Sequence, residues 1–336
     1  MTFDERVTAL APLGFTPRQT RFLVTAALHS GYCLRRQYQA FAGLSHGQQV
    51  NDFFDALVRR KLAHSFLYQP NRGHIYHLHA KPLYRALAQR DNRNRRQVSP
   101  AVIARKLMVL DYVLTLPDAE WYATEEDKVG LFTRERGIPL GDLPARVYAP
   151  TDRHSRPTTR YFIHKLPVYL TTDRSVVHFV YLVNDETGHG LEQFLQDHVR
   201  LFTALPAWSV VAVCPREMGG LAACRTVFDR FAATTWEPAP QDGIGDLRWF
   251  FATRQLVEGG DLRSLSVADL DRFREARRRF TGARMEALYG GWLAHGDLAI
   301  ADENDRVPQV QAPAAQLITH KIVSTYRQFG SLPGVC

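Results

Sequence analysis

The fold of this chain is decided by residues 47–79, which read GQQVNDFFDALVRRKLAHSFLYQPNRGHIYHLH. The first half carries apolar residues at positions i, i+3, i+4, i+7 and i+8: Val50, Phe53, Phe54, Leu57 and Val58. This spacing predicts a helix over about 47–61 with one apolar stripe against a core. Two strand-like runs follow and flank the turn residues 70–73, PNRG, which predict a β-hairpin.

Two further helices are predicted upstream of this segment. One begins at Thr16-Pro17 and stops at Ser30-Gly31, and the next covers about Leu34–Ala42. Three helices followed by a two-stranded hairpin is the order of a winged helix-turn-helix. We therefore predict that fold for the N-terminal part.

In such a fold the third helix enters the major groove of DNA, where amide side chains pair with adenine. The outward-facing amides expected to read bases are Gln48, Gln49 and Asn51. Basic and imidazole side chains are expected on phosphates, which set the register without reading sequence; they are Arg18, Arg21, Arg35, Arg36, Arg59, Arg60, Lys61, Arg72 and His74. The alternative is a winged helix used for protein contacts, with these residues merely solvated.

The charge distribution favours a polyanionic partner. The whole chain has a net charge of +8, yet residues 1–106 hold 17 Lys and Arg against 5 Asp and Glu. The remaining residues hold 25 against 29. The entire basic excess therefore lies in the first third of the chain, where the predicted winged helix is.

Length and composition set the number of domains and the cell compartment. A chain of 336 residues predicts at least two domains, and the polar, basic stretch 89–100, QRDNRNRRQVSP, predicts the boundary: residues 1–98 and 99–336. We expect no membrane span, because no run of 18 apolar residues occurs. The N-terminus lacks the pattern of a signal peptide, and four cysteines are too few for a disulfide scaffold. A soluble, cytoplasmic protein is expected.

The second part predicts a mixed α/β domain. A helix over about 100–116 precedes strand-like runs in 146–149, 159–170 and 175–183, the last two joined by a hairpin turn at 172–174. Then come a helix (190–204), a buried strand (208–214), a helix (221–232), a strand (246–252) and a final helix (314–329). This is the order of a restriction-endonuclease-like core, a mixed sheet with helices on both faces and a helical tail.

Both parts resemble one known family. Five segments carry the likeness: GFTPRQTRFLVTAALHSGYCLRRQYQAFAG (14–43), VNDFFDALVRRKLAHS (50–65), HIYHLHAK (74–81), LPVYL (166–170) and VVHFVYLVNDETGHGLEQFLQDHVRLF (176–202). They resemble the replication-relaxation family of plasmids and integrative elements. The likeness covers about residues 14–215. It implies a winged helix joined to a domain similar to the PD-(D/E)XK nucleases.

The chain departs from that family where a nuclease needs carboxylates to hold Mg²⁺. The family's Pro-Asp pair reads Pro167-Val168, and the Glu of the next strand is Val183. We therefore expect no catalytic residue and no bound metal. The alternative is a Mg²⁺-dependent nuclease that keeps a remnant site of Lys165, Asp173, Asp185 and Glu186.

Other patterns add little chemistry. His77 and His79 lie on one face of the predicted hairpin, where we expect solvent or phosphate contacts in preference to a metal site. The arginines of 270–280 are expected to form ion pairs more than a second DNA contact. No P-loop, nucleophile elbow or dinucleotide fingerprint occurs, so no cofactor is expected.

The sequence as a whole predicts a homodimeric protein that binds double-stranded DNA and regulates transcription or maintenance of a mobile element. In this reading the second part serves for oligomerisation or partner contacts. A Mg²⁺-dependent nuclease and a protein-binding adaptor without DNA affinity remain the alternatives.

Overall fold

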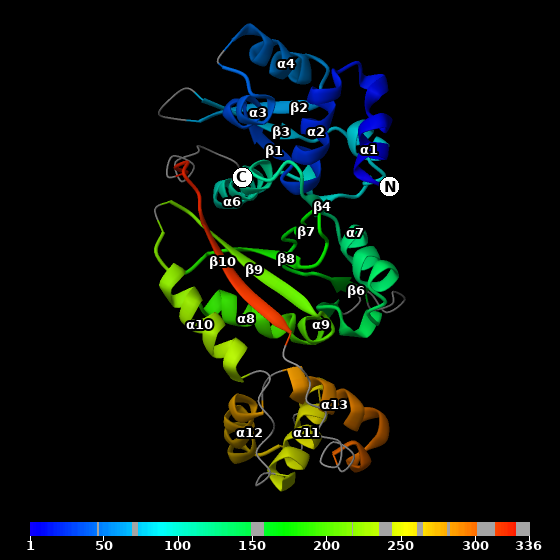
Figure 1. Cartoon of the computed structure of the whole chain (residues 1–336), viewed down its shortest axis with the longest axis vertical. Helices are drawn as coiled ribbons and strands as arrows, with labels where there is room; N and C mark the ends of the chain where they lie inside the picture. Colours follow the sequence, from blue (N-terminus) through cyan, green and yellow to red (C-terminus); the bar gives the residue numbers. More distant parts are fainter. Residues whose placement is uncertain are drawn as a thin grey trace.

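The chain folds into three parts that follow one another along its longest axis (Figure 1). The computed structural model describes residues 1–45, 47–68, 73–148, 158–216, 218–234, 244–260, 265–280, 283–300 and 313–326. A helical N-terminal unit lies at one end, a mixed five-stranded sheet in the middle and a small helical unit at the other end. The predicted mixed α/β class is confirmed at this level.

The N-terminal unit combines five helices with a three-stranded antiparallel sheet. The helices are α1 (Phe3–Ala9), α2 (Pro17–His29), α3 (Arg35–Ala42), α4 (Gln48–Arg59) and α5 (Lys81–Ala86). The strands are β1 (Tyr32–Leu34), β2 (Ala63–Tyr68) and β3 (Gly73–Leu78), in the order β1-β3-β2. The predicted hairpin is present as β2 and β3, although its turn, residues 69–72, lies outside the described residues. The sequence did not predict α1, α5 or β1.

Local signals explain where these helices begin and end. Thr16 accepts a hydrogen bond from the backbone of Gln19 and Pro17 occupies the first turn of α2, so its start is doubly specified. Gly43 ends α3 in the left-handed conformation, at φ 62°, which a glycine adopts without steric cost.

The predicted stripe of α4 builds the core of this unit. Val50, Phe53, Phe54 and Leu57 are buried, and the rings of Phe53 and Phe54 contact Tyr38. Val58, predicted as the fifth member of the stripe, is 39% exposed. That part of the prediction was wrong because the buried stripe is narrower than five positions and leaves Val58 at its edge.

The central sheet has the strand order β10-β9-β8-β7-β4. Its strands are β4 (Glu120–Tyr122), β7 (Val168–Leu170), β8 (Val177–Leu182), β9 (Ala207–Cys214) and β10 (Ala314–Lys321). The last three are parallel, whereas β7 is antiparallel to both β8 and β4. One face packs against α6 (Pro100–Leu114) and the other against α8 (His189–Asp197), α9 (Val199–Thr203) and α10 (Leu221–Thr234).

The run 159–170, predicted as one strand, is two strands in different sheets. Its first part is β6 (Thr158–Tyr161), which pairs with β5 (Ala145–Tyr148) in a two-stranded sheet of its own. Its last part is β7 of the central sheet. Phe162 and Lys165 between them have φ angles of 51° and 56°, and such left-handed residues cannot continue an extended strand.

Two predictions near the C-terminus were wrong. Residues 246–252, predicted as a strand, lie in α11 (Ile244–Glu258), because Leu247, Phe250 and Phe251 are buried at helical spacing. Residues 314–321 form β10 instead of the start of a final helix, because parallel pairing with β9 satisfies the backbone groups of every second residue along the segment. Residues 327–329 of that prediction lie outside the described residues.

The predicted helical tail corresponds to the third part of the molecule. Helices α11, α12 (Val267–Arg279) and α13 (Ala283–His295) enclose a separate apolar cluster, and the chain then returns to the sheet as β10. Shorter elements complete the fold: α7 (Glu125–Gly130), a π-helical turn (Leu131–Glu135) and 3-10 turns at Ala11–Leu13, Arg93–Arg95 and Leu140–Asp142.

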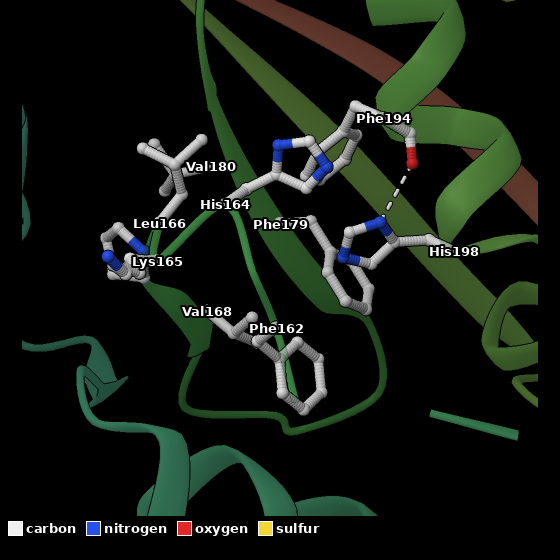
Figure 2. A pocket seen from close by; sticks show the side chains of 10 residues that line it. Phe162, His164, Lys165, Leu166, Val168, Phe179, Val180, Phe194 and His198 are labelled. Carbon is white, nitrogen blue, oxygen red and sulfur yellow. Dashed lines mark hydrogen bonds between the residues drawn. The ribbon is translucent and has the colours of Figure 1, made fainter. Parts of the chain in front are cut away.

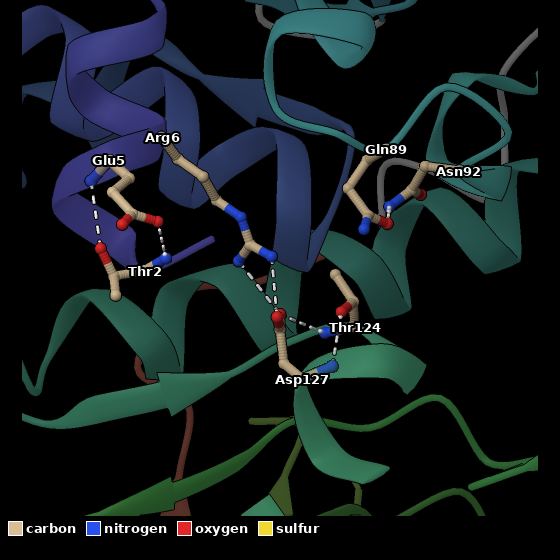
Figure 3. A network of polar contacts seen from close by, with 7 residues as sticks. All are labelled: Thr2, Glu5, Arg6, Gln89, Asn92, Thr124 and Asp127. Atoms are coloured by element: carbon tan, nitrogen blue, oxygen red, sulfur yellow. Dashed lines mark hydrogen bonds and ion pairs between the residues drawn. The ribbon is translucent and has the colours of Figure 1, made fainter. Parts of the chain in front are cut away.

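Helix α6 joins the N-terminal unit to the sheet. Its Leu110 belongs to the core of the N-terminal unit, whereas Ile103 and Leu107 pack with residues of the sheet. A partly buried ion pair adds to this connection, since Arg6 of α1 donates two hydrogen bonds to Asp127 of α7 (Figure 3). The predicted boundary after residue 98 stays a prediction, because the helix that follows it contributes to both cores.

Candidate functional site

Helix α4 presents the residues predicted to read bases. Gln48 and Gln49 are exposed and Asn51 is half-buried, whereas the opposite side of the helix is packed in the core. Gln48 is engaged within the helix, donating a hydrogen bond of 2.7 Å to Asp52. Among the described residues, the side chains of Gln49 and Asn51 form no hydrogen bond. They are therefore the two amides of α4 whose donors and acceptors are available to a partner.

Most of the predicted phosphate-binding arginines are engaged within the protein. Arg18 donates to the backbone carbonyl of Ala42 at the end of α3, and Arg60 to that of Leu13 at 2.5 Å. Arg21 pairs with Asp4 at 2.8 Å. These guanidinium groups hold helices of the N-terminal unit together, which leaves fewer of their donors for another molecule.

Arg35 and Arg36 connect α3 to its neighbours. Arg35 lies 3.7 Å from Asp55 of α4. Arg36 donates two hydrogen bonds to Asp111 of α6, at 2.8 and 2.9 Å, and a third to the hydroxyl of Tyr326. This network ties α3 to α6 and to the segment after β10, a role that their sequence positions did not indicate.

Arg59 and Lys61 remain the most available cations beside α4. Both are exposed, and within the described residues neither side chain forms a hydrogen bond or ion pair. Lys61 has a left-handed backbone, with φ 56°, where the chain turns from α4 into β2. Arg72, predicted at the tip of the hairpin, lies outside the described residues.

The hairpin histidines are mostly committed to the protein. His74 is half-buried, with its Nδ1 atom 2.7 Å from the Ser65 hydroxyl. His77 is buried and stacks on Tyr32, so the prediction that it faces solvent was wrong. Burial lowers the pKa of His77 to about 4 and thereby keeps it neutral. The described residues contain no cluster of three or more metal-ligating side chains.

The predicted remnant nuclease residues lie at two ends of the sheet. Asp173 occupies the turn between β7 and β8, whereas Asp185 and Glu186 follow the far end of β8. Lys165, exposed and just before β7, lies at the same end as Asp185 because β7 and β8 are antiparallel. Asp173 is thus separated from the other three by the length of β8.

The two aspartates hold the backbone in place. Asp185 accepts hydrogen bonds from the backbone N–H groups of Thr187, Gly188 and Gly190 at the start of α8. Burial acts to raise its pKa, but these bonds and one from the Thr187 hydroxyl lower it overall. Hydrogen bonds from the hydroxyls of Ser175 and Thr171 lower the pKa of Asp173.

The two positions where the resemblance expects metal ligands are buried in apolar surroundings. Val168 and Val183 are each 2% exposed and belong to the core beneath α8. A valine offers no oxygen to a cation. Among the described residues, the arrangement therefore lacks the convergent carboxylates that a PD-(D/E)XK centre requires.

A small cavity lies under α8, and no sequence pattern indicated it (Figure 2). His164 binds Asp197 at 2.8 Å, while the Nδ1 atom of His198 donates to the carbonyl of Phe194. Burial lowers the pKa of His198 to about 3, so its ring is neutral. The cavity volume is about 10 Å³, enough for at most one water molecule, so it admits no substrate as it stands.

Buried Lys128 lies beside this cavity. Its Nζ atom donates to the carbonyl of Leu166 at 2.9 Å and lies 5.2 Å from the ring centre of Phe162. Burial lowers its pKa to about 8. The contact fixes the loop between β6 and β7, which is the segment that separates the two sheets.

Comparisons with known proteins assign no family to this chain. No protein-family model, curated protein or solved structure matches it. Within the described ranges, every helix is too short or too polar to cross a bilayer.

Proposed function

We propose that this protein binds double-stranded DNA and inserts α4 into the major groove. The observation that carries the proposal is the outward face of α4. There the amide groups of Gln49 and Asn51 form no hydrogen bond with the described residues, while Phe53 and Phe54 anchor the opposite face in the core. Amide side chains on a rigid helix are suited to paired hydrogen bonds with adenine.

The surrounding architecture supports this proposal. The order α2, β1, α3, α4, β2, β3, with β1 and β2 on either side of β3, corresponds to a winged helix-turn-helix. Arg59 and Lys61 lie at the end of α4 towards β2, where they are placed to contact phosphates beside the groove. The excess of 17 basic over 5 acidic residues in 1–106 favours approach to a polyanion.

The proposal extends to the rest of the chain. We infer that the sheet region descends from a nuclease-like domain whose metal site is lost, in line with the resemblance to the replication-relaxation family. A regulator of transcription or maintenance on a mobile element, acting as a homodimer, is the corresponding role. The Mg²⁺-dependent nuclease alternative has no specific observation in its favour, since Val168 and Val183 are buried among apolar side chains.

The experiment that tests DNA recognition is selection of a preferred site from randomised duplex by the full-length protein, followed by binding of single variants. Gln49→Ala and Asn51→Ala should each weaken binding to the preferred site by about 1–3 kcal/mol and change binding to random duplex much less. Affinity should be measured by titration at fixed salt.

Arg59→Ala and Lys61→Ala are the matched controls. Each should weaken binding to both duplexes about equally and reduce the slope of log affinity against log salt by about one unit, because each removes one phosphate contact. If the amide variants behave like these two, α4 does not read sequence. If the wild-type protein binds no duplex at low salt, the DNA-binding proposal fails and the adaptor alternative takes its place.

A further inference from the structure

Among the described residues, nothing pairs with the outer backbone groups of β10, the strand at one edge of the central sheet. Among the described strands, β10 pairs with β9 alone and is the last strand on its side of the sheet. It is also one of the two longest described strands, with eight residues. Figure 1 shows it running along the central part of the molecule, from the helical unit towards the N-terminal unit.

The pairing with β9 determines which residues face the free edge. The backbone N–H of Ala314 donates to Pro206, and that of Ile322 donates to Cys214. Because backbone groups alternate along a strand, the even-numbered residues point towards β9. The N–H and C=O groups of the odd-numbered residues therefore point outward, and these residues are Ala315, Leu317, Thr319 and Lys321.

Within its described residues, this strand lacks the sequence features that usually prevent pairing at an edge. Natural edge strands are blunted by charges, prolines, bulges or short length. Residues 314–320, AAQLITH, contain no Asp, Glu, Lys, Arg or Pro, and the pairing with β9 runs without a bulge through all eight residues. Lys321, at the very end, is the one charged side chain of the strand.

The edge is complementary to itself. In an antiparallel pair, opposite residues exchange two hydrogen bonds, so two copies of one strand satisfy each other around a twofold axis. A register centred on Ile318 places Ala315 opposite the second copy's Lys321 and Leu317 opposite its Thr319. All four outward residues are then paired, whereas a shift of the centre to 317 would use Pro313, which has no N–H to donate.

We propose that β10 is the dimerisation edge of this protein and that a second copy of the chain pairs with it antiparallel, with Ile318 on the twofold axis. The two five-stranded sheets then form one continuous ten-stranded sheet. The pairing places no two like charges of β10 opposite each other, because Lys321 lies opposite an alanine. The proposal does not rest on DNA binding and is tested without DNA.

The pairing has a consequence for the arrangement of the two N-terminal units. The segment after β10 reaches α3, since Tyr326 accepts a hydrogen bond from Arg36, whereas the helical unit precedes β10. The end of β10 therefore points towards its own N-terminal unit (Figure 1). In an antiparallel partner, the N-terminal unit lies at the opposite end of the joined sheet. The two N-terminal units of the dimer are therefore far apart.

The first test measures the mass of the full-length protein by analytical ultracentrifugation. Wild type should sediment at twice the 38.2 kDa of one chain. Thr319→Pro should be monomeric, because proline removes an outward N–H and places its ring at the interface without touching the bonds to β9. Thr319→Val keeps that N–H and should remain dimeric. Circular dichroism of each variant verifies that the chain is folded.

A cross-linking test addresses the register, in a Cys336→Ser background to remove the terminal thiol. Ile318→Cys should form a disulfide-linked dimer on oxidation, because residues opposite each other at a non-hydrogen-bonded position lie close enough for the bond. Thr319→Cys should not, since the second copy's Thr319 is not opposite it. A monomeric wild type, a dimeric Thr319→Pro variant, or equal cross-linking at 318 and 319 would overturn the proposal.

Discussion

The outward face of α4 and the end of β8 both carry polar side chains above an apolar core, but their polar groups are used in opposite ways. On α4, Gln49 and Asn51 form no hydrogen bond among the described residues. At the end of β8, Asp185 accepts three bonds from backbone N–H groups. The comparison teaches that residue type alone does not identify a binding group: an uncommitted amide is available to a partner, whereas a fully bonded carboxylate supports the fold.

The largest effect is expected from the core beneath α4. Phe54→Ala should lower the free energy of unfolding by about 3–5 kcal/mol, because the buried ring contacts Phe53 and Tyr76 and its loss leaves a cavity. Thermal or urea unfolding measures this loss. At a temperature where the variant stays folded, it should also weaken DNA binding, since α4 is less firmly held.

The matched control lies in the central sheet. Phe179→Ala in β8 removes an equally buried ring and should cost a similar free energy while leaving DNA affinity unchanged. Equal losses of DNA affinity in the two variants would mean that the N-terminal unit and the sheet are not functionally distinct.

A second prediction concerns two histidines, half-buried His29 in the N-terminal unit and buried His198 beside the central sheet. Burial lowers the pKa of both His29 and His198 to about 3, from the ordinary value of 6.5. Between pH 6.5 and about pH 3, both histidines are protonated in the unfolded chain and neutral in the folded chain. The free energy of unfolding therefore falls as the pH falls. At pH 5 each histidine should reduce the free energy of unfolding by about 2 kcal/mol relative to pH above 7.

Urea unfolding at pH 7.5 and pH 5 measures this effect. His29→Phe and His198→Phe should each remove roughly half of the loss of unfolding free energy that the two histidines cause between pH 7.5 and pH 5. The control is His189→Phe, at an exposed position, which should leave this loss unchanged. Stability that rises on acidification would contradict the neutral state of these two rings in the folded chain.

The smallest effect is expected at the end of β8. Asp185→Ala should lower the free energy of unfolding by about 0.5–2 kcal/mol, because the first turn of α8 loses the acceptor of its N–H groups. DNA affinity should not change, and Glu186→Ala, at an exposed neighbouring position, should affect neither property. DNA cleavage with Mg²⁺ that disappears in Asp185→Ala would assign this aspartate to a metal site and reverse the comparison.

The sequence predicted the N-terminal unit better than the rest of the chain. Apolar spacing in α4 and turn residues around 70–73 act locally, and the helix and hairpin appear where they were expected. β1 was missed because three residues carry too little pattern, and it is defined by pairing with β3. Near the C-terminus, residues 246–252 were predicted as a strand and are helical, whereas residues 314–321 were predicted as helical and form a strand. A short apolar run fits either structure, and tertiary packing decides between them.

The candidate site divides in the same way. The sequence itself determined which side chains of α4 face outward, because the helical period fixes them relative to the buried stripe. The tertiary structure alone decided which of those side chains are available. The sequence predicted Arg36 as a phosphate ligand. In the folded chain it donates hydrogen bonds to Asp111 and Tyr326, which lie 75 and 290 positions away in the sequence. Sequence specifies a side chain's chemistry and local direction, but a hydrogen-bond partner distant in sequence is set only when the whole chain is folded.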